Sequence, residues 1–176
     1  MRKLVPLCLF IFLCASVTYA QNTPSSDEYN KAEFYAGFSH NRVDLDGDRE
    51  GANGFELSAT GNLSRYFGLK ADYAFHRKSF GGGFDFNANT FVGGVQIKDN
   101  SKETKVKPFV HAMVGGARLS GLGESSSGFA GVFGGGIDIR AGKRVDIRII
   151  QFDYNPTRIE GFTQHNFRIG AGIVFH

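Results

Sequence analysis

The stretch QHNFRIGAGIVFH, residues 164–176, decides the fold. Over residues 167–175 every second side chain is apolar, and the residues between them are small or polar except Val174. A period of two predicts a β-strand. One face of this strand is apolar enough to lie against hydrocarbon, and the other carries Arg168, which favours a strand with lipid outside and a polar filling inside.

The same alternation recurs in seven earlier segments. We expect strands over residues 33–39, 55–62, 69–76, 90–98, 108–119, 129–140 and 145–154. In the fifth segment the alternation places His111 inside, although Phe109 and Met113 then share its face. In the seventh, the doublet Ile149 and Ile150 switches the apolar phase, which predicts a β-bulge. An even number of strands lets the first and last pair, so we predict an all-β fold, an eight-stranded antiparallel up-and-down transmembrane β-barrel.

The connections between these strands alternate in length. Long polar or Gly-rich segments follow the odd-numbered strands: DLDGDREGAN, RKSFGGGFDFN, SGLGESSSG and NPTRIEGFTQ. The connections around residues 64–66 and 141–144 are tight, and the one at 99–105 is intermediate. Barrels of outer membranes have long outward loops and short periplasmic turns. We therefore expect the four long segments to be extracellular loops and the other three to face the periplasm.

The composition excludes several classes of protein. Among the 176 residues there are 24 Gly and 18 Phe but only 4 Pro and no Trp. Because each Gly costs a helix interior about 1 kcal/mol relative to Ala, this content argues against a helical bundle. The formal charge of +3 comes from spread-out residues without a basic run, which argues against a nucleic-acid partner.

The first 30 residues are expected to lie outside the barrel. Residues 1–20 have a basic start, an apolar core and small residues before a cut after Ala20, which predicts a secretory signal peptide. Both cysteines, Cys8 and Cys14, lie in it, so the mature chain is expected to hold no thiol. Residues 21–30 are polar and aperiodic and are expected to form a mobile arm. The barrel domain is assigned to residues 31–176.

These features together resemble the bacterial outer-membrane β-barrel family that includes the OmpA-type transmembrane domain and the opacity-type, porin-like surface proteins. The resemblance rests on the signal peptide, the order of the eight segments, the motifs SRYFGLKADYAF and PFVHAMVGGARL, and the aromatic Phe175. It implies a place in the outer membrane of a Gram-negative bacterium, with membrane lipid and the barrel-insertion machinery as partners. It also implies that Phe175 is the assembly signal. No peptidoglycan-binding domain follows the barrel, so cell-wall anchoring is not implied.

No metal, cofactor or catalytic site is predicted. The acidic residues Asp44, Asp46, Asp48 and Glu50 resemble a calcium loop, but the positions that need Gly and Glu hold Arg49 and Phe55. Lipid A deacylases, which are small barrels of the same membrane, resemble one another in a His followed two residues later by Ser. Here His165 is followed by Asn166 and Phe167, so the nucleophile is missing at that place.

The inferred inner face holds charges of both signs. An isolated buried charge costs several kcal/mol, so these residues are expected to pair across the lumen. An eight-stranded barrel is only wide enough for side chains to fill it, which favours a plugged interior over a pore. The predicted ion-pair network consists of Glu33, Glu56, Lys70, Asp72, Asp138, Arg140, Asp146, Arg148 and Arg168.

The sequence thus predicts a non-enzymatic outer-membrane protein with a structural or surface-interaction role. It would contact an extracellular ligand through its long loops. Two alternatives stay open at this point: a lipid-modifying enzyme with the same fold, and a narrow solute channel.

Overall fold

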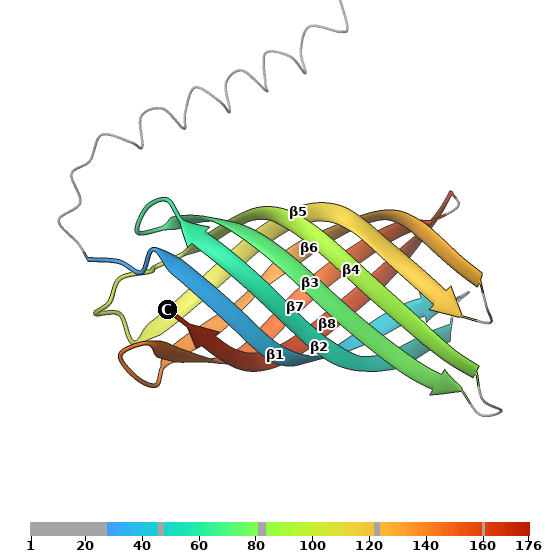
Figure 1. Ribbon diagram of the computed structural model, residues 1–176, viewed down its shortest axis with the longest axis horizontal. Helices are drawn as coiled ribbons and strands as arrows, with labels where there is room; N and C mark the ends of the chain where they lie inside the picture. The colour runs from blue at the N-terminus through green and yellow to red at the C-terminus, as the bar shows by residue number, and fades with distance from the viewer. Residues whose placement is uncertain (1–27, 46–47, 81–83, 122–123, 160) are drawn as a thin grey trace, which may run out of the picture.

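The computed structural model describes residues 28–45, 48–80, 84–121, 124–159 and 161–176. Within these ranges the chain forms a closed barrel in which each strand pairs antiparallel with the next, and β1 pairs with β8 (Figure 1). This confirms the predicted fold class. The strands are β1 (Ala32–Leu45), β2 (Asp48–Asn62), β3 (Phe67–Phe80), β4 (Phe84–Lys98), β5 (Val106–Gly121), β6 (Glu124–Arg140), β7 (Val145–Ile159) and β8 (Phe162–Phe175).

The pairing of β1 with β8 closes the barrel. Its register runs from Phe34 opposite Phe175 to Arg42 opposite Phe167, so the stretch that predicted the fold supplies the closing strand. Without this pairing, β1 and β8 would be edge strands with unpaired N–H and C=O groups. The β1–β8 ladder gives these groups hydrogen-bond partners, which a sheet that spans the membrane needs because hydrocarbon offers none. The chain end at His176 and the start of β1 lie at the same end of the barrel (Figure 1).

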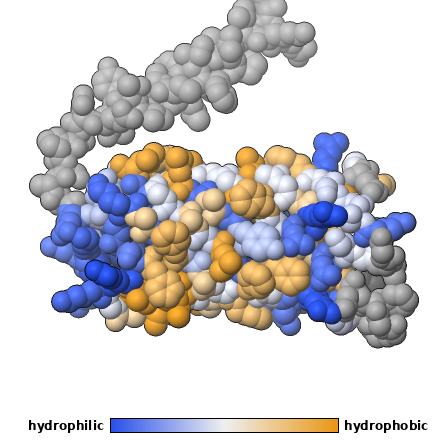
Figure 2. Space-filling view, viewed as in Figure 1, coloured by the Kyte–Doolittle hydropathy of each residue, from blue (hydrophilic) through white to orange (hydrophobic). Residues whose placement is uncertain are grey.

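Alternation separates an apolar outer face from a buried inner face. Phe34, Phe91 and Phe129 point outward and keep 60%, 65% and 58% of their surface exposed, whereas Glu56 and Asp138 point inward and are fully buried. Figure 2 shows apolar residues over the middle of the barrel and hydrophilic residues at both ends. This is the surface expected of a barrel that spans a bilayer. Within the described ranges, no helix combines the length and apolar character that crossing a membrane requires.

The predicted bulge in β7 is confirmed. The register of β7 shifts against β8 between Arg148 and Gln151, and against β6 next to Asp138. Ile149 and Ile150 are consecutive and both exposed on the outer face. The bulge therefore turns Arg148 and Gln151 to the same inner side, although they lie three positions apart.

The four segments expected to be long loops are instead mostly strand. The paired strands run on until only residues 46–47, 81–83, 122–123 and 160–161 lie between them. Alternation of apolar and polar residues marks a strand only where one of its faces is apolar. Towards this end of the barrel both faces of the strands are polar, so the alternation disappears although the backbone pairing continues. We call this end of the barrel the hairpin end.

The opposite end, which we call the turn end, carries the connections 63–66, 99–105 and 141–144 and the chain end. Arg65 donates two hydrogen bonds to the Asp99 carboxylate, at 2.9 and 3.1 Å, and ties the first two of these turns together. Because the Arg65 guanidinium binds the charged form, it lowers the pKa of Asp99 to about 2. Thr104 donates a further hydrogen bond to Asp99.

The expected signal peptide, residues 1–20, and most of the expected arm lie outside the described residues. Tyr29 forms an isolated β-bridge with Ser101, and the Asn30 amide donates to the Asn100 carbonyl. The last residues of the expected arm are thus paired with the turn at 99–105. Asp46 of the acidic segment also lies outside the described residues. Among the residues that the structure describes, no group of three or more metal-ligating side chains occurs.

Two glycines of β2 test how closely the barrel wall is packed. A β-carbon on Gly54 would stand 1.8 Å from the Phe75 carbonyl oxygen, whereas one on Gly61 would meet no atom within 4 Å. Gly54→Ala should lower the free energy of unfolding by about 1 to 3 kcal/mol, the usual cost of overpacking. Gly61→Ala should change it by less than about 0.5 kcal/mol. Urea unfolding in lipid vesicles measures both, and equal losses would contradict the close packing at Gly54.

Candidate functional site in the charged interior

Among the residues whose burial the structure describes, the barrel interior holds eleven buried ionic side chains. They are five cations, Lys70, Lys98, Lys107, Arg148 and Arg168, and six carboxylates, Glu33, Glu56, Asp72, Asp138, Asp146 and Asp153. Each is 3% exposed or less, and each stands on the inner side of its strand because of the two-residue alternation. The interior is therefore nearly balanced in charge, and its chemistry depends on how these groups are paired.

Arg148 has the largest set of contacts. Its Nε and Nη2 donate to the two carboxylate oxygens of Asp138 at 2.8 and 3.1 Å, and its Nη1 donates to the Gln151 side-chain oxygen at 2.6 Å. The rings of Tyr35 and Phe109 lie 4.2 and 4.0 Å from its guanidinium carbon. A planar guanidinium is suited to such two-pronged pairing and stacking. Arg148 is thus held by hydrogen bonds in the plane of its guanidinium group and by aromatic rings packed against that group.

Towards the turn end, the pairing continues through two lysines. Lys98 Nζ donates to Glu33 at 2.6 Å and to Asp138 at 3.1 Å, so Asp138 is shared by Lys98 and Arg148. Lys107 Nζ donates to Asp146 at 2.9 Å. These contacts connect β1, β4, β5, β6 and β7 across the lumen.

In the middle of the barrel Arg168 lies among three carboxylates. Its nearest atoms are 2.7 Å from Asp153, 3.3 Å from Asp72 and 3.5 Å from Glu56. Gln151 joins this group to Arg148, because its amide nitrogen donates to Glu56 and Asp153 while its oxygen accepts from Arg148. The two halves of the charged interior therefore form one connected network.

His111 links Lys70 to Asp153. The Lys70 ammonium lies 3.3 Å from His111 Nδ1, and His111 Nε2 lies 2.8 Å from Asp153 Oδ1. Because an ammonium has no acceptor, Nδ1 accepts and Nε2 carries the proton that is donated to Asp153. His111 thereby connects the Lys70 ammonium on β3 to the Asp153 carboxylate on β7.

Part of the interior is apolar. Val92, Met113, Ala117, Ala130 and Val132 form a buried cluster between β4, β5 and β6. The sequence placed Met113 on the inner face but treated it as an irregularity. In a barrel this narrow the lumen is a packed core, so methyl groups and ion pairs can fill neighbouring parts of it.

The structure brings together eight of the nine residues expected in the network. The exception is Arg140, the last residue of β6, which is half-buried at the turn end and donates to the Ser101 carbonyl oxygen. Sequence reasoning left out several members that do take part. Lys98, Gln151 and Asp153 stood on predicted inner faces but were not included, and Lys107 was missed because its strand was started at Pro108.

A buried Ser–His pair bears on the enzyme alternative. Ser39 Oγ lies 2.9 Å from His76 Nε2, and the two side chains are 0% and 2% exposed. Nucleophilic catalysis needs a base held by a third group and a path for the substrate. No carboxylate within the described ranges bonds to His76, and both side chains are enclosed by the barrel wall. The pair has the geometry of a structural hydrogen bond.

The family model "Outer membrane protein beta-barrel domain" matches residues 7–175. Neisserial surface protein A has a similar structure, with a TM-score of 0.70 and 15% identity over 85% of this chain and 99% of that one. Ail, the attachment invasion locus protein of Yersinia pestis, is similar with a TM-score of 0.54 and 21% identity, and the match covers 84% of this chain and 100% of that one.

The N-terminal β-barrel domain of Pseudomonas aeruginosa OprF is also similar, with a TM-score of 0.56 and 11% identity over 84% of this chain and 100% of that one. At these identities the likeness concerns the fold. The chain has no significant match among curated protein sequences.

The shared carboxylate of Asp138 generates a stability prediction. Arg148→Ala should lower the free energy of unfolding by about 3 kcal/mol, the low end of the cost of breaking a buried ion pair, because Lys98 still pairs with Asp138. The double variant Arg148→Ala with Asp138→Ala should lose less free energy of unfolding than the sum of the losses in the two single variants. Urea unfolding in lipid vesicles gives both values. The exposed Arg118→Ala is the control, and an equal loss there would contradict a special role for Arg148.

Proposed function

The chain belongs to the outer membrane β-barrel protein family, and we propose that within the outer membrane it is a non-enzymatic protein with a closed interior that acts through its hairpin end. The closed interior carries this proposal. Side chains as large as Arg148, Arg168, Lys98 and Met113 are less than 2% exposed inside the barrel. Eight strands enclose a space that such side chains fill, which leaves no continuous path for a solute.

The surface role is assigned to the hairpin end because the strands extend there beyond the apolar middle of the barrel. Exposed polar residues such as Arg42, Arg77, Arg118 and Arg158 point outward near the ends of the four odd strands. Paired strands hold these side chains in a defined arrangement, as a binding surface for a partner outside the cell requires.

Phe175 keeps the role proposed for it in assembly. Its ring is 47% exposed on the outer face of β8, and its backbone is paired between Phe34 of β1 and Val145 of β7. An exposed aromatic at the closing seam is accessible to an insertion machinery while the barrel is still open. This role stays a prediction.

The orientation can be tested with single cysteines, because both native cysteines lie in the expected signal peptide. Cysteines that replace residues near the hairpin tips should react with a membrane-impermeant maleimide on intact cells. Those that replace residues of the turns should react only after the outer membrane is opened. The tip positions are Gly47, Gly82, Ser126 and Glu160, and the turn positions are Arg65 and Lys143. The reverse pattern, or equal labelling of both sets, would reject the orientation.

Conductance tests the closed interior directly. Planar bilayers containing the unmodified protein should show no steady, large conductance. Arg148→Ala removes a side chain from the lumen and should raise the frequency of openings. The neighbouring Ile147→Arg should leave conductance unchanged, although its charge meets hydrocarbon and costs about 2 to 4 kcal/mol of stability. A steady, large conductance of the unmodified protein would favour a solute channel instead.

A further inference from the structure

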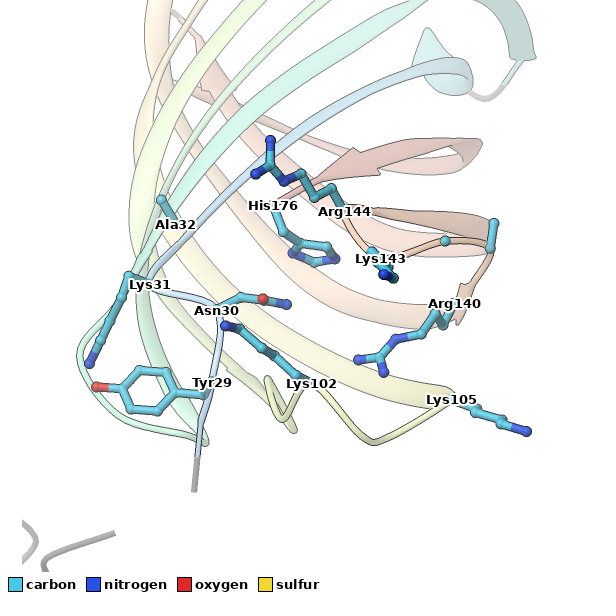
Figure 3. Close-up of a pocket in the computed structure, with 12 residues that line it drawn as sticks. Tyr29, Asn30, Lys31, Ala32, Lys102, Lys105, Arg140, Lys143, Arg144 and His176 are labelled. Atoms are coloured by element: carbon cyan, nitrogen blue, oxygen red, sulfur yellow. The ribbon is translucent and has the colours of Figure 1, made fainter. Parts of the chain in front are cut away.

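We propose that a basic basin at the turn end of the barrel binds phosphate-bearing anions. The basin is a cavity of about 1000 Å³ that opens at the mouth of the barrel (Figure 3). It is lined by the residues that precede and begin β1, by the turns 99–105 and 141–144, by the end of β6 and by His176. It lies at the opposite end from the hairpins, so it is independent of the surface role proposed above.

The charged side chains that line the basin are basic wherever the structure describes them. Of the twelve described lining residues, six are Lys or Arg and none is Asp or Glu. The cations come from three separate places in the sequence, so no single basic run explains their meeting. They are Lys31, Lys102, Lys105, Arg140, Lys143 and Arg144. Like charges gathered on a concave surface focus the field and raise the local concentration of anions.

Three of these cations are held by the protein itself. Arg140 donates to the Ser101 carbonyl oxygen at 3.1 Å, Lys31 lies over the Tyr29 ring, and Lys102 forms an ion pair with Glu28. The Arg140 contact is to a neutral oxygen, so its charge is not cancelled. These contacts restrain three of the six cationic side chains, and most of the positive charge of the basin is not neutralised by them.

The other three cations have no carboxylate partner among the described residues. Lys105, Lys143 and Arg144 are exposed on their turns. The turn 99–105 also carries two carboxylates: Asp99 is already bound by Arg65 and Thr104, and the exposed Glu103 forms no ion pair with these cations. An anion that enters the basin would therefore find unpaired donors.

His176 separates the basin from the carboxylates of the interior. Its Nε2 lies 2.8 Å from Asp146, and its Nδ1 lies 3.5 Å from Glu33. Those two carboxylates also pair with Lys107 and Lys98 beneath the basin floor. They are engaged in the interior network and are not available to neutralise the basin. The positive charge of the basin therefore attracts anions from outside the barrel.

Phosphate is the class of anion that fits this donor set. A phosphate group carries up to two negative charges, and guanidinium groups such as those of Arg140 and Arg144 bind its oxygens in a two-pronged manner. In the orientation proposed above the basin opens toward the periplasm, next to the inner leaflet. The phosphate could then belong to a soluble compound or to a lipid headgroup, and the experiment below separates these sources.

The test uses the mature protein folded in uncharged maltoside micelles, with sodium tripolyphosphate as the probe and calorimetry at low ionic strength. The basin variant carries Lys105→Ala, Lys143→Ala and Arg144→Ala. The control variant carries Arg42→Ala, Arg118→Ala and Arg158→Ala, which removes the same charge from the hairpin end. The basin variant should bind about tenfold more weakly or worse, whereas the control should stay within about twofold of the unmodified protein.

Equal weakening in both variants, or none in the basin variant, would overturn the proposal, since binding would then follow net charge or lie elsewhere. Heat-modifiable mobility on gels verifies that each variant is folded. A third variant, with Lys105→Arg, Lys143→Arg and Arg144→Lys, keeps the charges and should retain the affinity. Its failure to do so, with folding intact, would also count against the site.

The source of the phosphate is separated in nanodiscs of phosphatidylcholine with or without cardiolipin. If the lipid headgroup occupies the basin, cardiolipin should weaken the binding of tripolyphosphate to the unmodified protein, and it should have no such effect on the basin variant. If the ligand is a soluble phosphate compound, the affinity of the unmodified protein should be the same in both discs. Either result supports the site and assigns its ligand.

Discussion

A lipid bilayer offers no hydrogen-bond partner to a peptide group, and the rest of this structure depends on that constraint. A sheet that spans the bilayer must therefore close on itself, which the pairing of β1 with β8 achieves. Closure at eight strands fixes a narrow interior, and the pleat of each strand sends alternate side chains into it. The apolar outer face and the crowded inner face both follow from the closed ladder.

The polar contents of the interior are a second consequence. A charge inside such a barrel is removed from bulk water, so it persists only where opposite charges and hydrogen bonds surround it. Arg148 shows how many contacts this requires: a carboxylate, an amide and two aromatic rings. Gln151 has a corresponding importance, because an amide can donate to carboxylates on one side and accept from a guanidinium on the other. It joins clusters that charges alone would leave separate.

The fold could be predicted from the sequence because alternation is a local signal with a direct physical cause. The doublet at Ile149 and Ile150 even located the bulge. Which charges pair with each other across the lumen could not be predicted, since Arg168 and Asp72 are brought together by the register of distant strands. The four loops were predicted to be too long, because a strand with two polar faces shows no alternation from which its end could be located. The basic basin was missed because four of its six cations lie in turns, where the sequence carries no periodicity.

The bulge in β7 has a consequence for how this family can change. Each strand has a parity, which means that odd and even positions face opposite sides of the barrel wall. One inserted or deleted residue moves every side chain beyond it from the lipid to the lumen or the reverse. Loss of Ile149 or Ile150 alone would remove the bulge and restore strict alternation, because Arg148 and Gln151 would both stay on the inner side. Loss of a residue outside the doublet, such as Ile147, would instead turn the residues on one side of it to the opposite surface and place charged side chains in hydrocarbon. Substitution keeps parity, whereas insertion or deletion outside the bulge does not. Barrels of this kind can therefore lose nearly all sequence identity while the length of each spanning segment stays fixed.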